Sequence, residues 1–165
     1  MADVHIARQL ARPQPAPAQT LISAADLWAD VRRAPGAPVS LGVARALRDN
    51  PKVAAQYRTM LEALAVAHSP VALAASDGEV ERRLGDAHLR LLPPDTPDGV
   101  PLLILTTPAA SATLEMIGPD GDVLRIALPP PDARTVILAL GPDVAEADRA
   151  LGLLRDPGTA MYLLP

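Results

Sequence analysis

The spacing of apolar residues changes near residue 69, and this change constrains the fold more than any other feature of the sequence. Before it, apolar residues recur every three or four positions, as in helices that bury one face. After it, apolar runs have the length of strands and are separated by turns rich in glycine and proline. We therefore predict an α+β fold: an N-terminal helical segment over residues 21–68, then an antiparallel β-sheet or small sandwich over residues 69–165.

Three helices are predicted within the helical segment. Ser23 and Asp26 form a capping-box pattern at the start of the first helix. Ser40 can cap a short second helix, and Asn50 before a proline is a strong start for a third, which we expect to continue to His68. Apolar residues in each helix fall on one side, so each is expected to bury one face.

The β-rich domain is predicted from short apolar runs and the turns between them. The first two runs are joined at Asp77-Gly78, and the clearest hairpin is "ATLEMI-GPDG-DVLRIAL". A late helix follows near residue 144, and a last strand ends the chain. The prolines at 129–131 cannot lie within a central ladder, so they turn the chain between sheets or protect an exposed edge. The residues expected in the core are Leu105, Met116, Ile126, Ile137 and Leu154.

Residues 1–20 are predicted to be a flexible tail. The stretch "RPQPAPAQ" alternates proline with small or polar residues, which favours extended geometry and offers little surface to bury. Such a tail can also act as a docking peptide, and the sequence leaves both interpretations open.

Charge and hydropathy bear on partners and location. The chain has a net charge of −4, a pI near 5.3 and only 2% aromatic residues, which argues against binding to nucleic acid. No apolar run is long enough for a signal peptide or a membrane span, and cysteine is absent. We expect a cytoplasmic protein that binds neither nucleic acid nor membrane.

Motifs for catalysis, metal or cofactor binding are not evident. The sequence contains no Gly-x-Ser-x-Gly, no phosphate-binding loop and no cysteine ligand set. Asp86 and His88 alternate on one predicted strand and, with Asp77, are the residues we would assign to a small-ligand enzyme. We predict instead a protein that is not an enzyme and has no catalytic residues, metal or cofactor.

Basic residues gather in the helical segment and suggest a surface for an acidic protein partner. The six residues of this predicted partner-binding site are Trp28, Arg32, Arg33, Arg45, Arg48 and Lys52. Tryptophan and arginine are the residues that most often anchor protein interfaces. Two interpretations of Trp28 remain open: it anchors a partner, or it seals the helices onto the sheet. The basic residues are likewise either a docking surface or an ordinary solvated face.

The stretch "ARALRDNPKVAAQYRTMLEALAVAHSP", residues 44–70, resembles the front helices of bacterial anti-sigma domains. These domains often run as Ala-Leu, a short polar break with proline, a long Ala- and Leu-rich helix with arginine, and an exit marked by proline. The zinc-binding His and Cys residues of one branch are missing here, so the resemblance is to the zinc-free pattern. It implies a helical front that holds a sigma factor and a separate C-terminal part.

These features together predict a non-enzymatic protein–protein interaction module that acts as a bacterial, cytoplasmic regulator of the anti-sigma type. The partner would be another protein, either a transcription factor or an assembly component. A structural accessory subunit of a larger assembly is the alternative, and a small-ligand enzyme is a third hypothesis.

Overall fold

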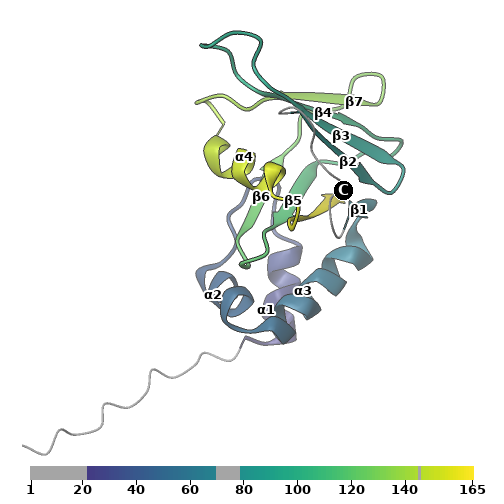
Figure 1. Cartoon of the computed structure of the whole chain (residues 1–165). Helices are drawn as coiled ribbons and strands as arrows, with labels where there is room; N and C mark the ends of the chain where they lie inside the picture. The colour runs from purple at the N-terminus through teal and green to yellow at the C-terminus, as the bar shows by residue number, and fades with distance from the viewer. Residues whose placement is uncertain (1–21, 70–78, 145) are drawn as a thin grey trace, which may run out of the picture.

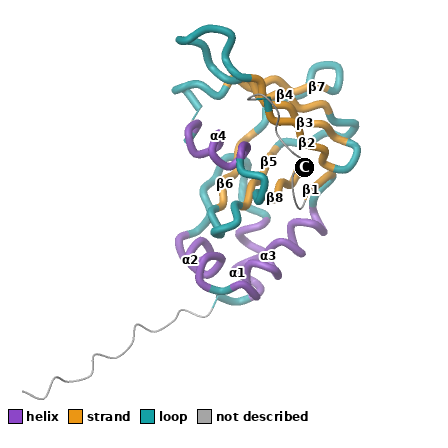
Figure 2. Tube along the Cα trace, viewed as in Figure 1, coloured by secondary structure: helices purple, strands orange, loops and turns teal. Residues whose placement is uncertain are grey.

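The computed structural model describes residues 22–69, 79–144 and 146–165, and within them it shows three layers (Figure 1). Helices α1–α3 form the first layer, and two four-stranded antiparallel sheets form the second and third. Figure 2 shows these helices gathered on one side of the strands, with α4 beside the sheets. The predicted α+β architecture, with helices at the front and one late helix, is confirmed, and the β part is a sandwich.

The three front helices begin at the predicted caps. In α1 (Ala24–Val31) the Ser23 hydroxyl and the Asp26 carboxylate complete a capping box. The Ser40 side chain accepts from the backbone of α2 (Leu41–Asp49), and Asn50 does the same for α3 (Pro51–Leu64). Each helix buries one face, so local capping and apolar spacing together explain this layer.

The third helix ends earlier than predicted. It stops at Leu64, and Ala65 is already extended. The Val66 amide donates to the Leu163 carbonyl at 2.8 Å, which leads the chain into strand β1 (Ala67–Ser69). His68 therefore belongs to the sheet, where its ring stacks on Tyr162. The prediction of helix up to His68 was wrong because strand pairing overrides the local helical preference of "ALAVAH".

The first sheet has the strand order β1-β8-β5-β6. Its members besides β1 are β5 (Thr113–Ile117), β6 (Val123–Ala127) and β8 (Ala160–Leu164). Strands β5 and β6 form the hairpin predicted around the GPDG turn, and Gly121 in that turn has a φ of +80°. The C-terminal strand β8 lies in the middle of the sheet, between β1 and β5.

The second sheet has the order β2-β3-β4-β7. Its strands are β2 (Val80–Leu84), β3 (Ala87–Leu92), β4 (Leu102–Thr106) and β7 (Thr135–Ala139), and β7 is an edge strand. The three prolines at 129–131 lie where the chain crosses from β6 in the first sheet to β7 in the second. This is one of the two roles predicted for them, a turn between sheets.

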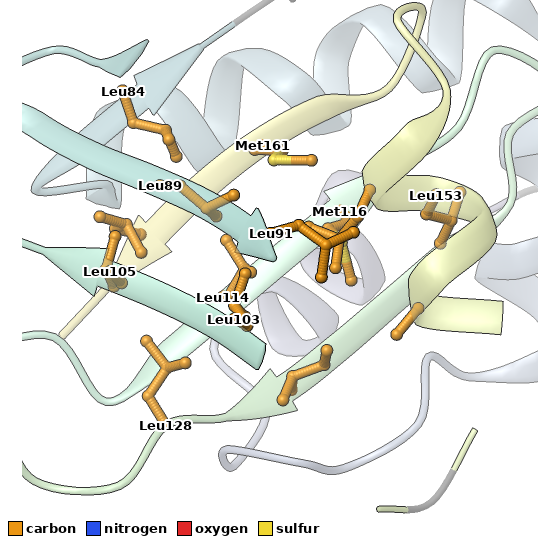
Figure 3. Close-up of a cluster of buried hydrophobic side chains, with 14 of the residues drawn as sticks. Leu84, Leu89, Leu91, Leu103, Leu105, Leu114, Met116, Leu128, Leu153 and Met161 are labelled. Carbon is orange, nitrogen blue, oxygen red and sulfur yellow. The ribbon is translucent and has the colours of Figure 1, made fainter. Parts of the chain in front are cut away.

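The main core lies between the two sheets, where aliphatic side chains from both inner faces interdigitate (Figure 3). Four of the five predicted core residues are buried: Leu105, Met116, Ile126 and Leu154. Ile137 was wrongly predicted, because it is 60% exposed on the outer face of β7. The run "TVILAL" is apolar at nearly every position, so its sequence did not reveal which alternate residues point inward.

Helix α4 (Ala147–Arg155) closes one side of the sandwich and is held there by a buried arginine. Arg82 of β2 is 1% exposed and donates to the carbonyls of Leu154 at 3.0 Å and Thr159 at 2.8 Å, and also to that of Asp156. Burial lowers the pKa of Arg82. A cation at the C-terminal end of a helix is stabilised by the carbonyl groups that the helix leaves unpaired.

Some predictions fall outside the described residues. They are the tail over residues 1–20, the strand "VALAAS" and the turn at Asp77-Gly78. Within the described part of the chain, no helix has both the length and the apolar character needed to cross a membrane.

Candidate functional site

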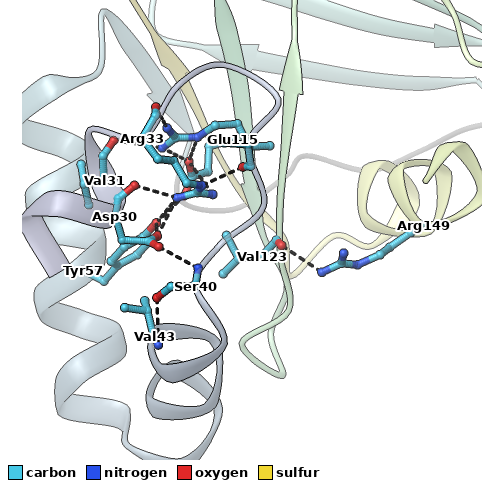
Figure 4. A network of polar contacts seen from close by, with 11 residues as sticks. Asp30, Val31, Arg33, Ser40, Val43, Tyr57, Glu115, Val123 and Arg149 are labelled. Atoms are coloured by element: carbon cyan, nitrogen blue, oxygen red, sulfur yellow. Dashed lines mark hydrogen bonds and ion pairs between the residues drawn. The ribbon is translucent and has the colours of Figure 1, made fainter. Parts of the chain in front are cut away.

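A network of charged side chains is buried between the helices and the first sheet (Figure 4). Asp30 and Arg33 come from α1 and the residues after it, Tyr57 from α3, and Glu115 and Arg125 from the hairpin β5–β6. Glu115 and Tyr57 are fully buried. Two carboxylates thus face two guanidinium groups, and their formal charges balance.

The Tyr57 hydroxyl lies at the centre of this network. It is 2.7 Å from Glu115 Oε1 and 2.9 Å from Asp30 Oδ2, and it accepts a hydrogen bond from Arg33 Nη1 at 2.8 Å. A phenol has one proton to donate, so it can donate to only one of the two carboxylates at a time. Burial raises the pKa of Tyr57 well above its usual range, and the Glu115 charge raises it further.

The two arginines tie the network to the backbone. Arg125 pairs with Glu115 and donates to the carbonyls of Val31 at 3.0 Å and Arg33 at 2.6 Å. Arg33 lies 3.3 Å from Glu115 and 2.7 Å from Asp30. Burial is the largest single influence on the pKa of Arg33 and acts to lower it, but Glu115, Tyr57 and Asp30 together outweigh burial and the pKa is raised. The network therefore fixes the end of α1 against the sheet.

A small cavity of ≈ 220 Å³ adjoins this network. Its walls combine Arg32, Arg33 and Arg125 with Thr113 and the apolar side chains Val31, Leu64 and Leu164. The guanidinium groups of Arg33 and Arg125 are already paired with Glu115 and Asp30, whereas that of Arg32 stacks on the Trp28 ring. Only one of the three arginines at the wall therefore has a charge not already paired within the network.

A second, more open cavity of ≈ 520 Å³ lies at one end of the second sheet. Asp86 lines it together with Thr106, Thr107 and Arg134. His88 does not line it and instead pairs with Glu81 at 2.6 Å on the outer face of β2 and β3. Asp77, the third member of the hypothetical enzyme site, lies outside the described residues. Within the described ranges, no group of three or more His, Cys, Asp or Glu side chains could hold a metal ion.

The six predicted partner-binding residues divide into five surface residues and one interior residue. Arg32, Arg45, Arg48 and Lys52 are exposed, and Trp28 is half-buried against the apolar residues of the helical layer. The guanidinium of Arg32 lies over the Trp28 ring, 5.0 Å from its centroid. Arg33 does not belong to this surface, because its side chain is only 8% exposed and is used in the buried network.

Helix α2 adds an exposed residue that the sequence prediction missed. Leu41, at the start of α2, is 63% exposed. It lies four residues before Arg45 and seven before Arg48, so these three side chains follow one side of the helix. We call this set the α2 stripe. The opposite side of α2 buries Val43 and Leu47.

The buried network was also missed, although one signal was present. Glu115 and Arg125 interrupt otherwise apolar strands on the two sides of the GPDG turn, and the register pairs them directly. Opposite charges placed across a hairpin predict a cross-strand ion pair. Tyr57 and Asp30 gave no comparable signal, because their contacts join residues far apart in the sequence.

Comparison with known proteins does not add to this description. No protein-family model, curated protein or solved structure matches the chain.

Proposed function

We propose that the protein is a non-enzymatic module that binds an acidic protein partner through the outer surface of its front helices. The single observation that carries this proposal is the α2 stripe, in which an exposed leucine is followed by two exposed arginines at helical spacing. An apolar residue flanked by arginines suits a partner that presents an apolar contact within an acidic surface.

The charge of the helical layer supports a partner of this kind. Residues 22–64 contain six basic and four acidic residues, although the whole chain has a net charge of −4. Two of these acids, Asp26 and Asp30, are engaged in the capping box and in the buried network. The surface basic residues are thus left with a positive balance, which would attract an acidic partner and make binding sensitive to salt.

The pair Trp28–Arg32 supplies a second contact on the same layer. The stacked ring restricts the Arg32 side chain, so less conformational entropy is lost when Arg32 is held by a partner. Trp28 also packs on the helical core, so it serves as a support as well as an anchor.

The proposed biological role is regulation by sequestering a protein such as a sigma factor. It rests on the anti-sigma-like pattern of residues 44–70, which covers the end of the α2 stripe and the whole of α3. Identification of the partner as a transcription factor would support this role. A fixed stoichiometric complex with other proteins would instead support the accessory-subunit alternative.

Site-specific crosslinking tests the surface directly. A photo-crosslinking amino acid is placed at Leu41, and at Arg83 on the outer face of β2 as the control, and the full chain is expressed in its native host. We expect a specific acidic protein to be captured from position 41 and not from position 83. Equal capture at both positions, or none at position 41, would contradict the proposal.

Charge reversal tests the same surface by affinity. Arg45→Glu combined with Arg48→Glu should weaken binding of the captured partner by about tenfold or more and reduce its dependence on salt. Arg83→Glu, which reverses the charge of one exposed residue of β2, should leave the affinity unchanged, whereas Arg45→Glu alone, the same change of charge, should weaken binding. Since all three side chains are exposed, the variants should fold normally.

A further inference from the structure

The outer face of the second sheet is divided into a charged half and an uncharged half. Around β2 and β3, Arg90 pairs with Glu79 and His88 contacts Glu81, and Arg83 also points outward. The outward residues of β4 and β7 carry no charge; they are Leu102, Ile104, Thr106, Thr135, Ile137 and Ala139. Val100 and Ile137 are among the most exposed large apolar residues of the described chain. Exposed apolar side chains on an uncharged surface favour contact with another apolar surface.

The edge of this sheet also has unpaired backbone groups. The Thr107 amide donates to the Arg134 carbonyl and the Leu140 amide to the Pro101 carbonyl, both at 2.9 Å. Along an antiparallel strand, the amide and carbonyl of one residue point to one side, and those of the next residue point to the other side. These two bonds therefore show that the even-numbered residues from Arg134 to Leu140 direct their backbone groups toward β4. The amides and carbonyls of Ile137 and Ala139 therefore point away from the sheet.

One end of the β7 edge is already occupied. Thr135 also points its backbone outward, but it exchanges hydrogen bonds of 2.7 and 2.8 Å with Asp132. The turn between them places Ala133 at a φ of 45° and Arg134 at 71°, in the left-handed region that such side chains rarely adopt. Among the residues that the structure describes, Ile137 and Ala139 have no corresponding partner.

We propose that β7 pairs antiparallel with β7 of a second copy of this chain, around a two-fold axis beside Leu138. This register places Ile137 opposite Ala139 of the second copy, and Ala139 opposite its Ile137. Ile137 and Ala139 of the two copies together supply four unpaired amides and four unpaired carbonyls. These groups would then form four hydrogen bonds between the chains. A register centred on Ile137 is less favourable, because it would place Ala139 opposite Thr135, whose backbone groups Asp132 already occupies.

Three features favour a second copy over an unrelated strand. The edge is uncharged, so two copies meet without like-charge repulsion, and a two-fold axis makes one apolar surface complementary to itself. The charged half of the outer face lies around β2 and β3, on the strands away from the β7 edge. Finally, β7 ends at Ala139 and the chain turns from Gly141, so the strand itself does not run on into the Asp132 turn of the second copy.

Oligomeric state and hydrogen exchange test this pairing on the full chain. Sedimentation equilibrium should show a reversible dimer, and the amides of Ile137 and Ala139 should exchange more slowly as protein concentration rises. The amide of Ala127 is the internal control, because the register also directs it outward, on the edge strand β6 of the other sheet. Its exchange should not depend on concentration. A monomer at all concentrations would overturn the proposal.

Two variants at one position separate edge pairing from other contacts. Ala139→Pro removes one outward amide and should weaken dimerisation by about tenfold or more, whereas Ala139→Val keeps the amide and should leave the dimer intact. Ile137→Lys places a charge next to the axis, on an exposed side chain opposite Ala139 of the second copy. It should also give monomers, so it replaces Ala139→Pro if that variant fails to fold. A dimer that tolerates both Ala139→Pro and Ile137→Lys would exclude β7 pairing.

Discussion

The two faces of the first sheet are packed in different ways. The face toward the second sheet meets it through aliphatic side chains such as Leu114 and Met116. The face toward the helices also buries apolar residues, but it includes Glu115 and Arg125, which are bonded to α1 and α3. One strand, β5, therefore contributes alternate residues to an apolar core and to an ionic one.

The two kinds of packing have different roles: the apolar core mainly stabilises the fold, and the ionic network mainly orients the helices on the sheet. Aliphatic packing is favourable but non-directional, so it holds two sheets together without fixing every detail of how they meet. Hydrogen bonds to charged groups are directional and costly when broken, so the network of Tyr57 and Glu115 specifies how α1 and α3 lie on the sheet. The proposed partner surface lies on these helices, and its geometry depends on that network.

The most severe test of this comparison is removal of the central carboxylate. Glu115→Ala leaves Arg33 and Arg125 buried without their main counter-charge, and we expect a loss of about 3–5 kcal/mol in the free energy of unfolding. Urea denaturation of the purified variant measures it. Glu81→Ala, the same change on a residue whose side chain is 59% exposed, should cost under about 0.5 kcal/mol. Equal effects of the two changes would mean that the network contributes little.

The sandwich core is expected to respond to lost volume. Leu105→Ala removes a fully buried side chain and should cost about 2–5 kcal/mol, measured by the same denaturation experiment. Ile137→Ala is the matched control, because this side chain is mostly exposed and its truncation should change stability by under about 0.5 kcal/mol. A large loss at Ile137 at low protein concentration would contradict its outward orientation.

A smaller change tests the directional part of the network. Tyr57→Phe removes only the hydroxyl that Arg33 and the two carboxylates contact, and should cost about 1–3 kcal/mol in unfolding free energy. Tyr162→Phe should cost less, because burial and nearby charges raise the Tyr162 pKa without a hydrogen bond to a carboxylate, whereas the Tyr57 hydroxyl bonds to Glu115. A loss at Tyr162 that equals the loss at Tyr57 would count against a directional role.

Alkaline pH provides a second measurement on the same pair of variants. Burial raises the pKa of Tyr162 to about 12, and that of Tyr57 is raised as well. An unfolded tyrosine ionises near pH 10, so the unfolded chain loses these protons first and stability falls as the pH rises above about 10. Each Phe variant should lose less of its stability than the parent chain between about pH 9 and pH 11.

The sequence predicted the parts of the fold that depend on local chemistry. Ser23, Ser40 and Asn50 start the helices as expected, and the GPDG turn forms the expected hairpin. These features require only neighbouring residues, so a single sequence contains the necessary information.

What the sequence did not predict depends on contacts between distant segments. Val66 leaves the helix because Leu163, about a hundred residues later, offers a strand to pair with. Arg33 resembles a surface arginine until Glu115 is placed beside it. The partner surface was predicted as a set of basic residues, and the exposed side of α2 became clear only when the buried side was known.

The central position of β8 has a consequence for the order of events during synthesis. Helices α1–α3 are translated first, but the strand that completes the sheet beneath them follows about a hundred residues later, or roughly 5–20 s of elongation. During that interval the apolar sides of the helices have no completed sheet to cover them. Nascent chains of this protein should therefore be good clients for ribosome-associated chaperones until β8 has left the exit tunnel.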